Sequence, residues 1–324
     1  MASSAAAIFF WAAFALLLCA RAVPLHAAAG GSNCDGANCW ISLAGSRSAH
    51  DWTPQQLAAA KPAQLLKLEV DLLPNLNPNP LSFNCTPPVP LNASSCSSPP
   101  CPSMGKSFFF SPAIHDFGTC SGSFITDSII LTAGHCCMGV AGVWNPNITF
   151  FLDWNDGQYA AKYVPTELHV AQPWHDSLTR QYDWCFMKVE GSGPKHLPTA
   201  WAFDPNQFGD RGFSAFGWPA MPPYDGKYLY QAPGQCFGTS SMWPPSRFDP
   251  CTLKPPSSAM MYMTCNSMTP GCSGGPWYDP TNPSLGIFGL NSALILAPDQ
   301  PEIFVSPYFG TDFHDSCQQV GACK

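Results

Sequence analysis

From residue 105 onward, short apolar runs alternate with turn-forming residues. Typical runs are residues 108–110, 129–131 and 185–189. Glycine, proline, asparagine and aspartate separate these runs, and no apolar repeat of helical period interrupts the series. Many short β-prone runs with turn signals between them predict a β-sandwich or β-barrels. Because residues 105–324 are more than one small barrel needs, we expect an all-β domain of two antiparallel Greek-key barrels with a cleft between them.

The pattern before residue 105 is different. Residues 5–20 form an apolar run followed by small residues, which is typical of a secretory signal peptide. A membrane anchor is the alternative, although the run is short for spanning a bilayer. We therefore assign residues 1–29 to a signal peptide and residues 30–104 to an irregular Pro/Cys-rich segment.

The segment 30–104 contains one predicted helix. Thr53 is suited to the N-cap position and Pro54 to the first helical position, ahead of an alanine-rich run. Further along, residues 74–102 are dominated by proline, asparagine and serine, with three cysteines. This composition indicates a linker that is cross-linked by disulfides. The sequence leaves open whether the segment is a propeptide or a permanent extension.

Composition narrows the possible environment and partners. Charged residues make up only 11% of the 324 residues, with a formal net charge of −7 and no basic cluster, which argues against a nucleic-acid partner. Sixteen cysteines favour an oxidising compartment, and thus a secreted protein. Removing Cys19 with the signal peptide leaves an odd number, which predicts one free thiol or one intermolecular bridge. Three sequons predict glycosylation at Asn84, Asn92 and Asn147.

A serine lies among glycines at residues 271–276, with the sequence Gly-Cys-Ser-Gly-Gly-Pro. Glycines permit unusual backbone conformations and let a substrate's backbone come close. A hydroxyl held in such an exposed glycine-rich turn is suited to act as a nucleophile. The alternative is an ordinary Gly/Pro-rich surface turn that contains a serine.

Two further segments supply the partners that a nucleophilic serine needs. A serine hydroxyl requires an adjacent base, and histidine can take and return its proton near neutral pH. His135 ends the run Leu-Thr-Ala-Gly-His-Cys, and Asp183 precedes an apolar run in Tyr-Asp-Trp-Cys-Phe. A buried carboxylate would fix the tautomer of the imidazole. His135, Asp183 and Ser273 are therefore the candidate catalytic residues.

That order and its flanking residues resemble the chymotrypsin-clan (trypsin-like) serine endopeptidases, and most closely their secreted microbial trypsin-like and glutamyl-endopeptidase-like branch. Further matching pieces are residues 120–123, 216–219 and 289–292. The resemblance implies a trypsin-like protease domain over residues 105–324 that hydrolyses polypeptides through an acyl-enzyme. It implies a monomeric zymogen without metal or other cofactor, and without membrane contact after signal cleavage.

The resemblance also assigns roles to neighbouring groups. The backbone N–H groups of Gly271 and Ser273 should form the oxyanion hole. Cys120 and Cys136 match the disulfide that clamps the histidine loop. Proximity alone, by contrast, suggests the pairs Cys34–Cys39, Cys236–Cys251 and Cys317–Cys323, since spacing does not fix connectivity.

Two departures from the family pattern are informative. Animal relatives carry an aspartate before the serine, which pairs with a newly cut N-terminus, whereas this chain has Cys272. This thiol either bridges to a partner such as Cys265 or packs as a small buried group. The analogous substrate pocket lacks the charged or histidine residues of basic- or glutamate-selective enzymes, so we expect small or apolar side chains to be preferred. Its predicted lining comprises Ser267, Met268, Asn291, Ser292 and Leu294.

Two other functions stay open at this level. The first is a catalytically silent binding protein on a protease fold, suggested by Leu294 at the pocket mouth and by the unusual N-terminal segment. The second is a structural protein of the cell wall or matrix built on the Pro-rich segment. His169 and His175 lack the surrounding cluster of carboxylates and histidines that a metal cage needs.

Overall fold

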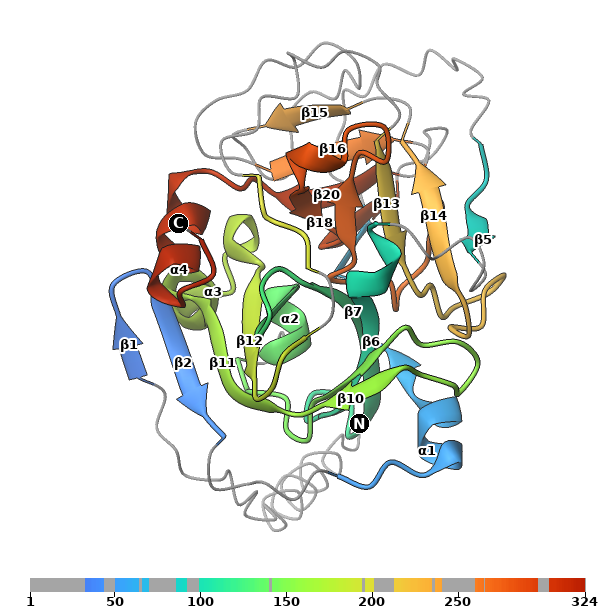
Figure 1. Cartoon of the computed structure of the whole chain (residues 1–324), viewed down its shortest axis with the longest axis horizontal. Coiled ribbons are helices and arrows are strands. Elements are labelled where there is room, and N and C mark those ends of the chain that lie inside the picture. Colours follow the sequence, from blue (N-terminus) through green and yellow to red (C-terminus); the bar gives the residue numbers. More distant parts are fainter. Residues whose placement is uncertain are drawn as a thin grey trace, which may run out of the picture. The chain divides into compact units, whose positions relative to one another are not determined.

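Strands dominate the computed structural model of the chain (Figure 1). Everything it describes belongs to one unit, Ser32–Lys324. The signal-peptide segment, Asn84, Asn92 and the pair Cys236–Cys251 lie outside the described residues. The residues described are 33–43, 50–63, 66–69, 86–91, 99–139, 142–193, 196–200, 213–234, 237–240, 260–264, 266–296 and 303–323.

The first barrel consists of seven antiparallel strands within a ten-stranded sheet. Its strands are β6 (Met104–Ser111), β7 (Asp116–Phe124), β8 (Ile129–Thr132), β9 (Thr149–Leu152), β10 (Ala161–Tyr163), β11 (Pro165–Ala171) and β12 (Cys185–Val189). The strand order is β11-β12-β8-β7-β6-β9-β10. Phe108, Phe124 and Phe150 are fully buried in its core, where aromatic rings pack edge to face.

The second barrel consists of two five-stranded sheets, each with one strand from the N-terminal segment. The first holds β13 (Ser214–Gly217), β14 (Leu229–Pro233), β17 (Pro276–Tyr278) and β18 (Ile287–Leu290), and the second holds β15 (Phe237–Ser240), β16 (Met260–Thr264), β19 (Ala293–Leu296) and β20 (Ile303–Pro307). Its core is built from Trp277, Met261, Phe288 and Phe304. The predicted all-β class with two barrels is confirmed.

The N-terminal segment is more regular than its composition predicted. Thr53 caps the predicted helix through a capping box with Gln56. All but one of the segment's strands pair directly with the barrels: β2 with β11, β3 with β7, β4 with β19 and β5 with β14, while β1 pairs with β2. Its elements are β1 (Asn33–Asp35), β2 (Asn38–Ser42), α1 (Pro54–Ala59), β3 (Lys61–Pro62), β4 (Leu66–Glu69) and β5 (Val89–Leu91).

Trp52 attaches this segment to the first barrel. Its ring lies 5.2 Å from that of Phe117 and 5.8 Å from that of Phe108, measured between centroids. The indole N–H donates a 3.0 Å hydrogen bond to Thr149 Oγ1. Pairing in four places and an aromatic anchor make the N-terminal segment part of the folded unit.

Short helices connect and close the barrels. They are α2 (Gly134–Cys137), α3 (Gln172–Ser177) and α4 (Thr311–Gln319), with 3-10 turns η1 (Cys101–Ser103), η2 (Arg180–Tyr182) and η4 (Pro283–Leu285). The C-terminal α4 packs on the first barrel, where Phe313 contacts Trp184 and Asn38 donates to the Ser316 carbonyl oxygen. The last helix thus ties the C-terminus to the barrel that carries His135 and Asp183.

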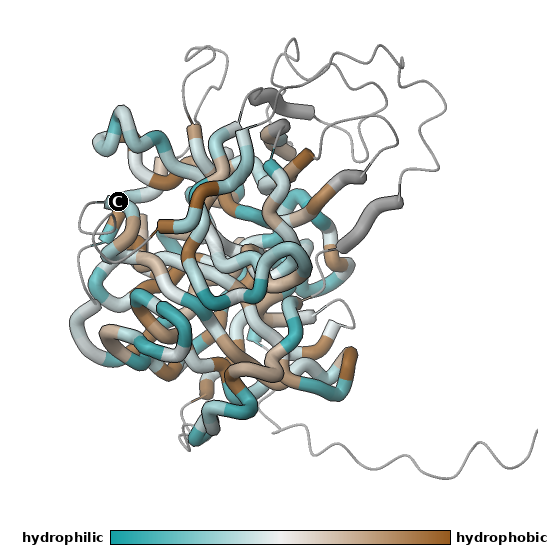
Figure 2. Tube along the Cα trace, turned by 90° about the vertical axis from the view of Figure 1, so that its right-hand side faces the viewer, coloured by the Kyte–Doolittle hydropathy of each residue, from teal (hydrophilic) through white to brown (hydrophobic). Residues whose placement is uncertain are grey.

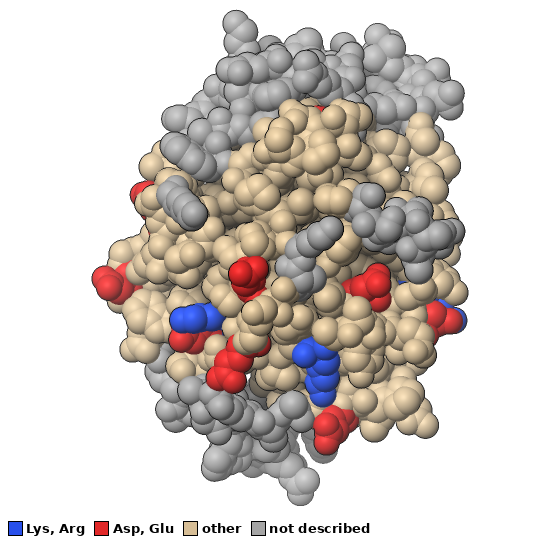
Figure 3. Space-filling model, viewed as in Figure 1, with Lys and Arg blue, Asp and Glu red and all other residues tan. Residues whose placement is uncertain are grey.

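Surface features agree with a protein of low charge. On the face drawn in Figure 3, acidic and basic side chains are sparse and intermixed. Teal and brown segments alternate along the coloured trace of Figure 2. Within the described residues, no helix is long and apolar enough to cross a membrane.

Candidate active site

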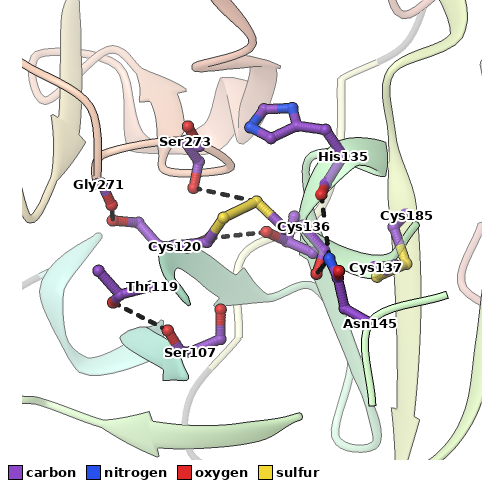
Figure 4. Close-up of a disulfide and its surroundings, with 12 residues drawn as sticks. Ser107, Thr119, Cys120, His135, Cys136, Cys137, Asn145, Cys185, Gly271 and Ser273 are labelled. Atoms are coloured by element: carbon purple, nitrogen blue, oxygen red, sulfur yellow. Dashed lines mark hydrogen bonds between the residues drawn. A yellow bond between two sulfur atoms is a disulfide. The ribbon is translucent and has the colours of Figure 1, made fainter. Parts of the chain in front are cut away.

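His135 is held by two disulfides that run in opposite directions. It lies in the one-turn helix α2, which begins two residues after the end of β8. Cys136 is bonded to Cys120 on β7, and Cys137 is bonded to Cys185 on β12 (Figure 4). The second pair was not recognised in the sequence, although adjacent cysteines in α2 could not both reach the same partner. It links the histidine helix covalently to the strand that begins two residues after Asp183.

Asp183 is fully buried, and its carboxylate accepts hydrogen bonds from three groups, two of them on His135. Its Oδ1 accepts from the His135 backbone N–H at 2.8 Å, and its Oδ2 lies 2.9 Å from His135 Nδ1. Ser292 Oγ donates to Oδ2 at 2.6 Å. A carboxylate on Nδ1 favours the tautomer that carries its proton there, which leaves Nε2 as a base.

Ser273 approaches this pair from the second barrel. The flanking glycines have left-handed backbone, with φ of +107° at Gly271 and +79° at Gly274. A Cβ on Gly274 would lie 2.1 Å from Thr132 Oγ1, so no larger residue fits there. The N–H of Ser121 on β7 donates to the Ser273 carbonyl oxygen at 2.7 Å, which joins the two barrels beside the site.

The reactive atoms are closed off from solvent. Ser273 is 0% exposed and His135 is 4% exposed. Neither Ser273 Oγ nor His135 Nε2 has a hydrogen-bond partner in the described part of the chain, so no hydrogen bond joins them. Figure 4 shows both side chains beside the Cys120–Cys136 disulfide. Catalytic hydrogen bonds of this kind often tighten only when substrate is bound.

Two backbone donors beside Ser273 are unused. Among the backbone hydrogen bonds of the described residues, neither the N–H of Gly271 nor that of Ser273 is a donor. Unused N–H groups next to a nucleophile can stabilise an oxyanion. The predicted donors are therefore available for that role.

The predicted pocket residues behave differently from one another. The side chains of Asn291 and Ser292 are engaged in the interior. Ser292 binds Asp183, and Asn291 bonds to Phe216 O, Cys272 O and Trp277 Nε1. The assignment of all five residues to the pocket stays a prediction. Met268 and Leu294 are buried in the core cluster of the second barrel, and Ser267 is half-buried.

Asn291 thus has a structural role that sequence reasoning missed. We expect Asn291→Ala to lower the free energy of unfolding by about 3 kcal/mol, since it removes the acceptor of the Trp277 N–H and the amide donor to Phe216 O and Cys272 O. Chemical denaturation with a matched Asn282→Ala variant, at a half-exposed position in a surface turn, measures this effect. Equal losses in the two variants would contradict the role given to Asn291.

Lys106 is a buried residue that the sequence analysis did not single out. Its Nζ donates to the Gly226 carbonyl oxygen at 2.6 Å and lies 5.0 Å from the Phe108 ring centroid. Burial lowers the pKa of this amine from 10.5 to about 7, with Asp225 opposing the shift. The neutral amine therefore becomes accessible in the folded state near pH 7.

The shift predicts a pH dependence of stability. Between about pH 7 and 10.5 the folded protein binds fewer protons at Lys106 than the unfolded chain, so stability rises with pH in this window. Below pH 7 both states are charged and the full cost of burial applies. We expect the unfolding free energy of wild type to rise, relative to that of Lys106→Met, by up to about 1.4 kcal/mol per pH unit in this window. Urea denaturation at pH 6.5 to 9 tests this, and parallel curves would contradict it.

The structure also describes several predicted cysteines, one predicted glycosylation site and the groups that could bind a metal. Cys34–Cys39 and Cys317–Cys323 are disulfide-bonded, while Cys272 is a free, fully buried thiol rather than a bridged one. Asn147 is exposed in the turn before β9, with φ of +61°. The described residues contain two clusters with the spacing of metal ligands, and the cysteines in both are disulfide-bonded.

Comparison with known proteins identifies the family. Residues 95–300 match the family model for trypsin. The chain belongs to the trypsin family. This family and the fold make it a serine endopeptidase, a hydrolase of peptide bonds. No curated protein matches the chain.

Solved structures support the same fold. The thermostable serine protease AL20 from an extremophilic microorganism is 24% identical with a TM-score of 0.54, covering 69% of this chain and 99% of that one. The protease Anisep from Arthrobacter nicotinovorans is also 24% identical with a TM-score of 0.54, over 70% of this chain and 98% of its own. A Glu endopeptidase is 16% identical with a TM-score of 0.53, and the match covers 74% of this chain and 98% of that one.

Proposed function

We propose that this trypsin-family protein is a secreted endopeptidase that uses His135, Asp183 and Ser273 as a catalytic triad. The observation that carries the proposal is the buried Asp183 carboxylate, which is bonded to both the backbone N–H and the Nδ1 of His135. An orienting carboxylate on this nitrogen leaves Nε2 directed to serve as a base.

The chemistry follows from this arrangement. Ser273 Oγ attacks the peptide carbonyl carbon while His135 Nε2 takes its proton, and the N–H groups of Gly271 and Ser273 bind the oxyanion. His135 then donates the proton to the departing amine, which leaves an acyl ester on Ser273. Water, deprotonated by the same nitrogen, hydrolyses the ester and regenerates the serine.

We further propose that the N-terminal segment keeps the full chain latent. It runs from β3, which pairs with β7 of the first barrel, to β4, which pairs with β19 of the second. Strand β19 begins directly after Ser292, the residue bonded to Asp183. Ala63 lies between these pairings, donates to Thr119 O at 2.9 Å and lines a small pocket together with His135.

We infer that this path contributes to the burial of the reactive atoms. Sheet edges on both sides of a protease cleft are suited to bind extended peptide backbone. The chain's own segment takes these edges, and both of its pairings are parallel. A polypeptide substrate would need this segment cut or displaced before it could pair there. The segment is thus a propeptide in function, although Trp52 anchors part of it in the barrel.

The test is labelling of the secreted protein with a fluorophosphonate probe. We expect weak labelling of the intact chain, strong labelling after limited proteolysis between residues 64 and 98, and no labelling of Ser273→Ala. Mass spectrometry should locate the adduct at Ser273. Ser284→Ala is the matched control, since it changes an exposed serine in η4 and should label like wild type.

A silent protease-fold binding protein is the second candidate. It is favoured by the absence of a hydrogen bond between Ser273 Oγ and His135 Nε2, and by the packing of Met268 and Leu294 in a core cluster. If neither intact nor processed protein is labelled while a control protease is, this candidate replaces the first.

Secretion, glycosylation and specificity complete the proposal. The disulfides and the apolar N-terminus support export, and the exposed position of Asn147 supports glycan attachment there. We propose a preference for small or apolar side chains before the cut bond and a monomeric state. A peptide-library cleavage profile, together with N-terminal sequencing of the secreted protein, tests the specificity and the maturation site.

A further inference from the structure

Cys272 directly precedes Ser273, the proposed nucleophile. Cys272 is fully buried and free, and burial raises the pKa of its thiol well above the usual range. It is therefore neutral and supplies no buried anion to pair with a newly cut N-terminus. If the N–H of Gly271 binds an oxyanion, as proposed above, some other contact must fix its direction.

One contact fixes the peptide plane on the N-terminal side of Gly271. The carbonyl oxygen of Pro270 accepts a 2.8 Å hydrogen bond from the Ala220 N–H. The Pro270 carbonyl and the Gly271 N–H belong to the same planar peptide group, so holding one directs the other. The two segments are in close contact here, because a Cβ on Gly271 would lie 2.7 Å from Trp218 O.

The Ser121 hydroxyl fixes the next peptide plane. Its Oγ donates to the Gly271 carbonyl oxygen at 3.0 Å and accepts from the Trp218 N–H at 3.0 Å. One buried hydroxyl thus bridges the segment that carries the nucleophile and the segment that supports it. The Ser121 backbone N–H also donates to Ser273 O at 2.7 Å, and Ser121 is 0% exposed.

We propose that Ser121 is a positioning residue that holds Gly271 in the conformation required for oxyanion binding. The proposal rests on the proposed catalytic function. A neutral hydrogen-bond network, built from Ser121, Trp218 and Ala220, orders this backbone without any charged N-terminus. Maturation then only has to uncover the cleft, and the oxyanion site is already formed in the full chain.

The test compares Ser121→Ala with Ser123→Ala in the processed, active protein. Ser123 is two residues further along β7 and equally buried, and its hydroxyl has no hydrogen-bond partner. We expect Ser121→Ala to lower kcat by about 10- to 100-fold with little change in KM, somewhat less than the loss of an oxyanion donor itself. Ser123→Ala should stay within about twofold of wild type, as expected for a group without a partner.

A second measurement separates positioning from general damage. A peptide aldehyde forms a tetrahedral adduct that uses the oxyanion site, whereas a product peptide with a free carboxylate is bound without forming that adduct. We expect the aldehyde to lose affinity in Ser121→Ala by the same factor as kcat, and the product peptide to keep its affinity. Thermal unfolding of both variants establishes that each is folded at the assay temperature.

The outcomes are distinct. If wild type is active and Ser121→Ala keeps both kcat and aldehyde affinity, or loses aldehyde and product affinity equally, the role of Ser121 is overturned while the proposed function stands. If processed wild type neither cleaves peptides nor accepts the fluorophosphonate, the proposed function itself has failed.

Discussion

Asp183→Asn should lower kcat by about 10⁴-fold, with KM nearly unchanged. The amide would present an N–H group to His135 Nδ1 in place of an oxygen. The imidazole would then carry its proton on Nε2 and could not accept one from Ser273. The His135 backbone N–H donates to Oδ1 at 2.8 Å and keeps the amide oxygen there, so the amide nitrogen takes the place of Oδ2, which faces Nδ1. The Ser292 hydroxyl would then have to turn and accept from the amide. Steady-state kinetics on processed protein measures the effect.

The chain offers a matched control for this substitution. Asp176 lies 2.8 Å from Nδ1 of His175 in a second histidine–aspartate pair within α3, where Asp176 is exposed and His175 is half-buried. Asp176→Asn should therefore leave kcat unchanged. Retention of more than a tenth of wild-type kcat by Asp183→Asn would remove Asp183 from the triad.

Replacing the disulfide between Cys137 and Cys185 by two serines should lower the free energy of unfolding by about 4 kcal/mol. This pair spans 48 residues of sequence and joins the helix of His135 to the strand that follows Asp183. Its loss should also lower kcat, because the distance between His135 and Asp183 is no longer fixed covalently. Urea denaturation and kinetics on the same preparation measure the two effects.

The pair Cys34–Cys39 supplies the comparison. It spans only five residues at the edge of the sheet, so its loss should cost about 2 kcal/mol and leave kcat unchanged. If both double variants lose kcat equally, the second disulfide beside His135 has no specific role in positioning.

Local patterns were sufficient for several features. Short β-prone runs separated by turn residues led to two barrels, and Thr53 with Pro54 led to the capped helix α1. The glycines around Ser273 could be recognised because left-handed backbone and close approach require that residue type. Information of this kind lies in neighbouring residues, and it does not depend on the rest of the fold.

Contacts between distant segments could not be predicted in the same way. Asn291 and Ser292 were expected in the pocket, yet their side chains bind Trp277 and Asp183 in the interior. Both residues lie in the short connection between β18 and β19, so the directions of their side chains depend on how these two strands are placed by their pairing partners. The N-terminal segment was expected to be irregular for the same reason, since β2 to β5 exist only because barrel edges accept them.

The sequence by itself therefore indicated the family and the all-β class and singled out His135, Asp183 and Ser273 as candidate catalytic residues, because short motifs of characteristic residue types carry each of these inferences. Only the tertiary structure decided that Cys272 is a free buried thiol, that Cys137 pairs with Cys185, and that Ser121 bridges Gly271 to Trp218. The physical reason is that these facts are distances between segments far apart in sequence. Such distances are set by how the two barrels pack around the site.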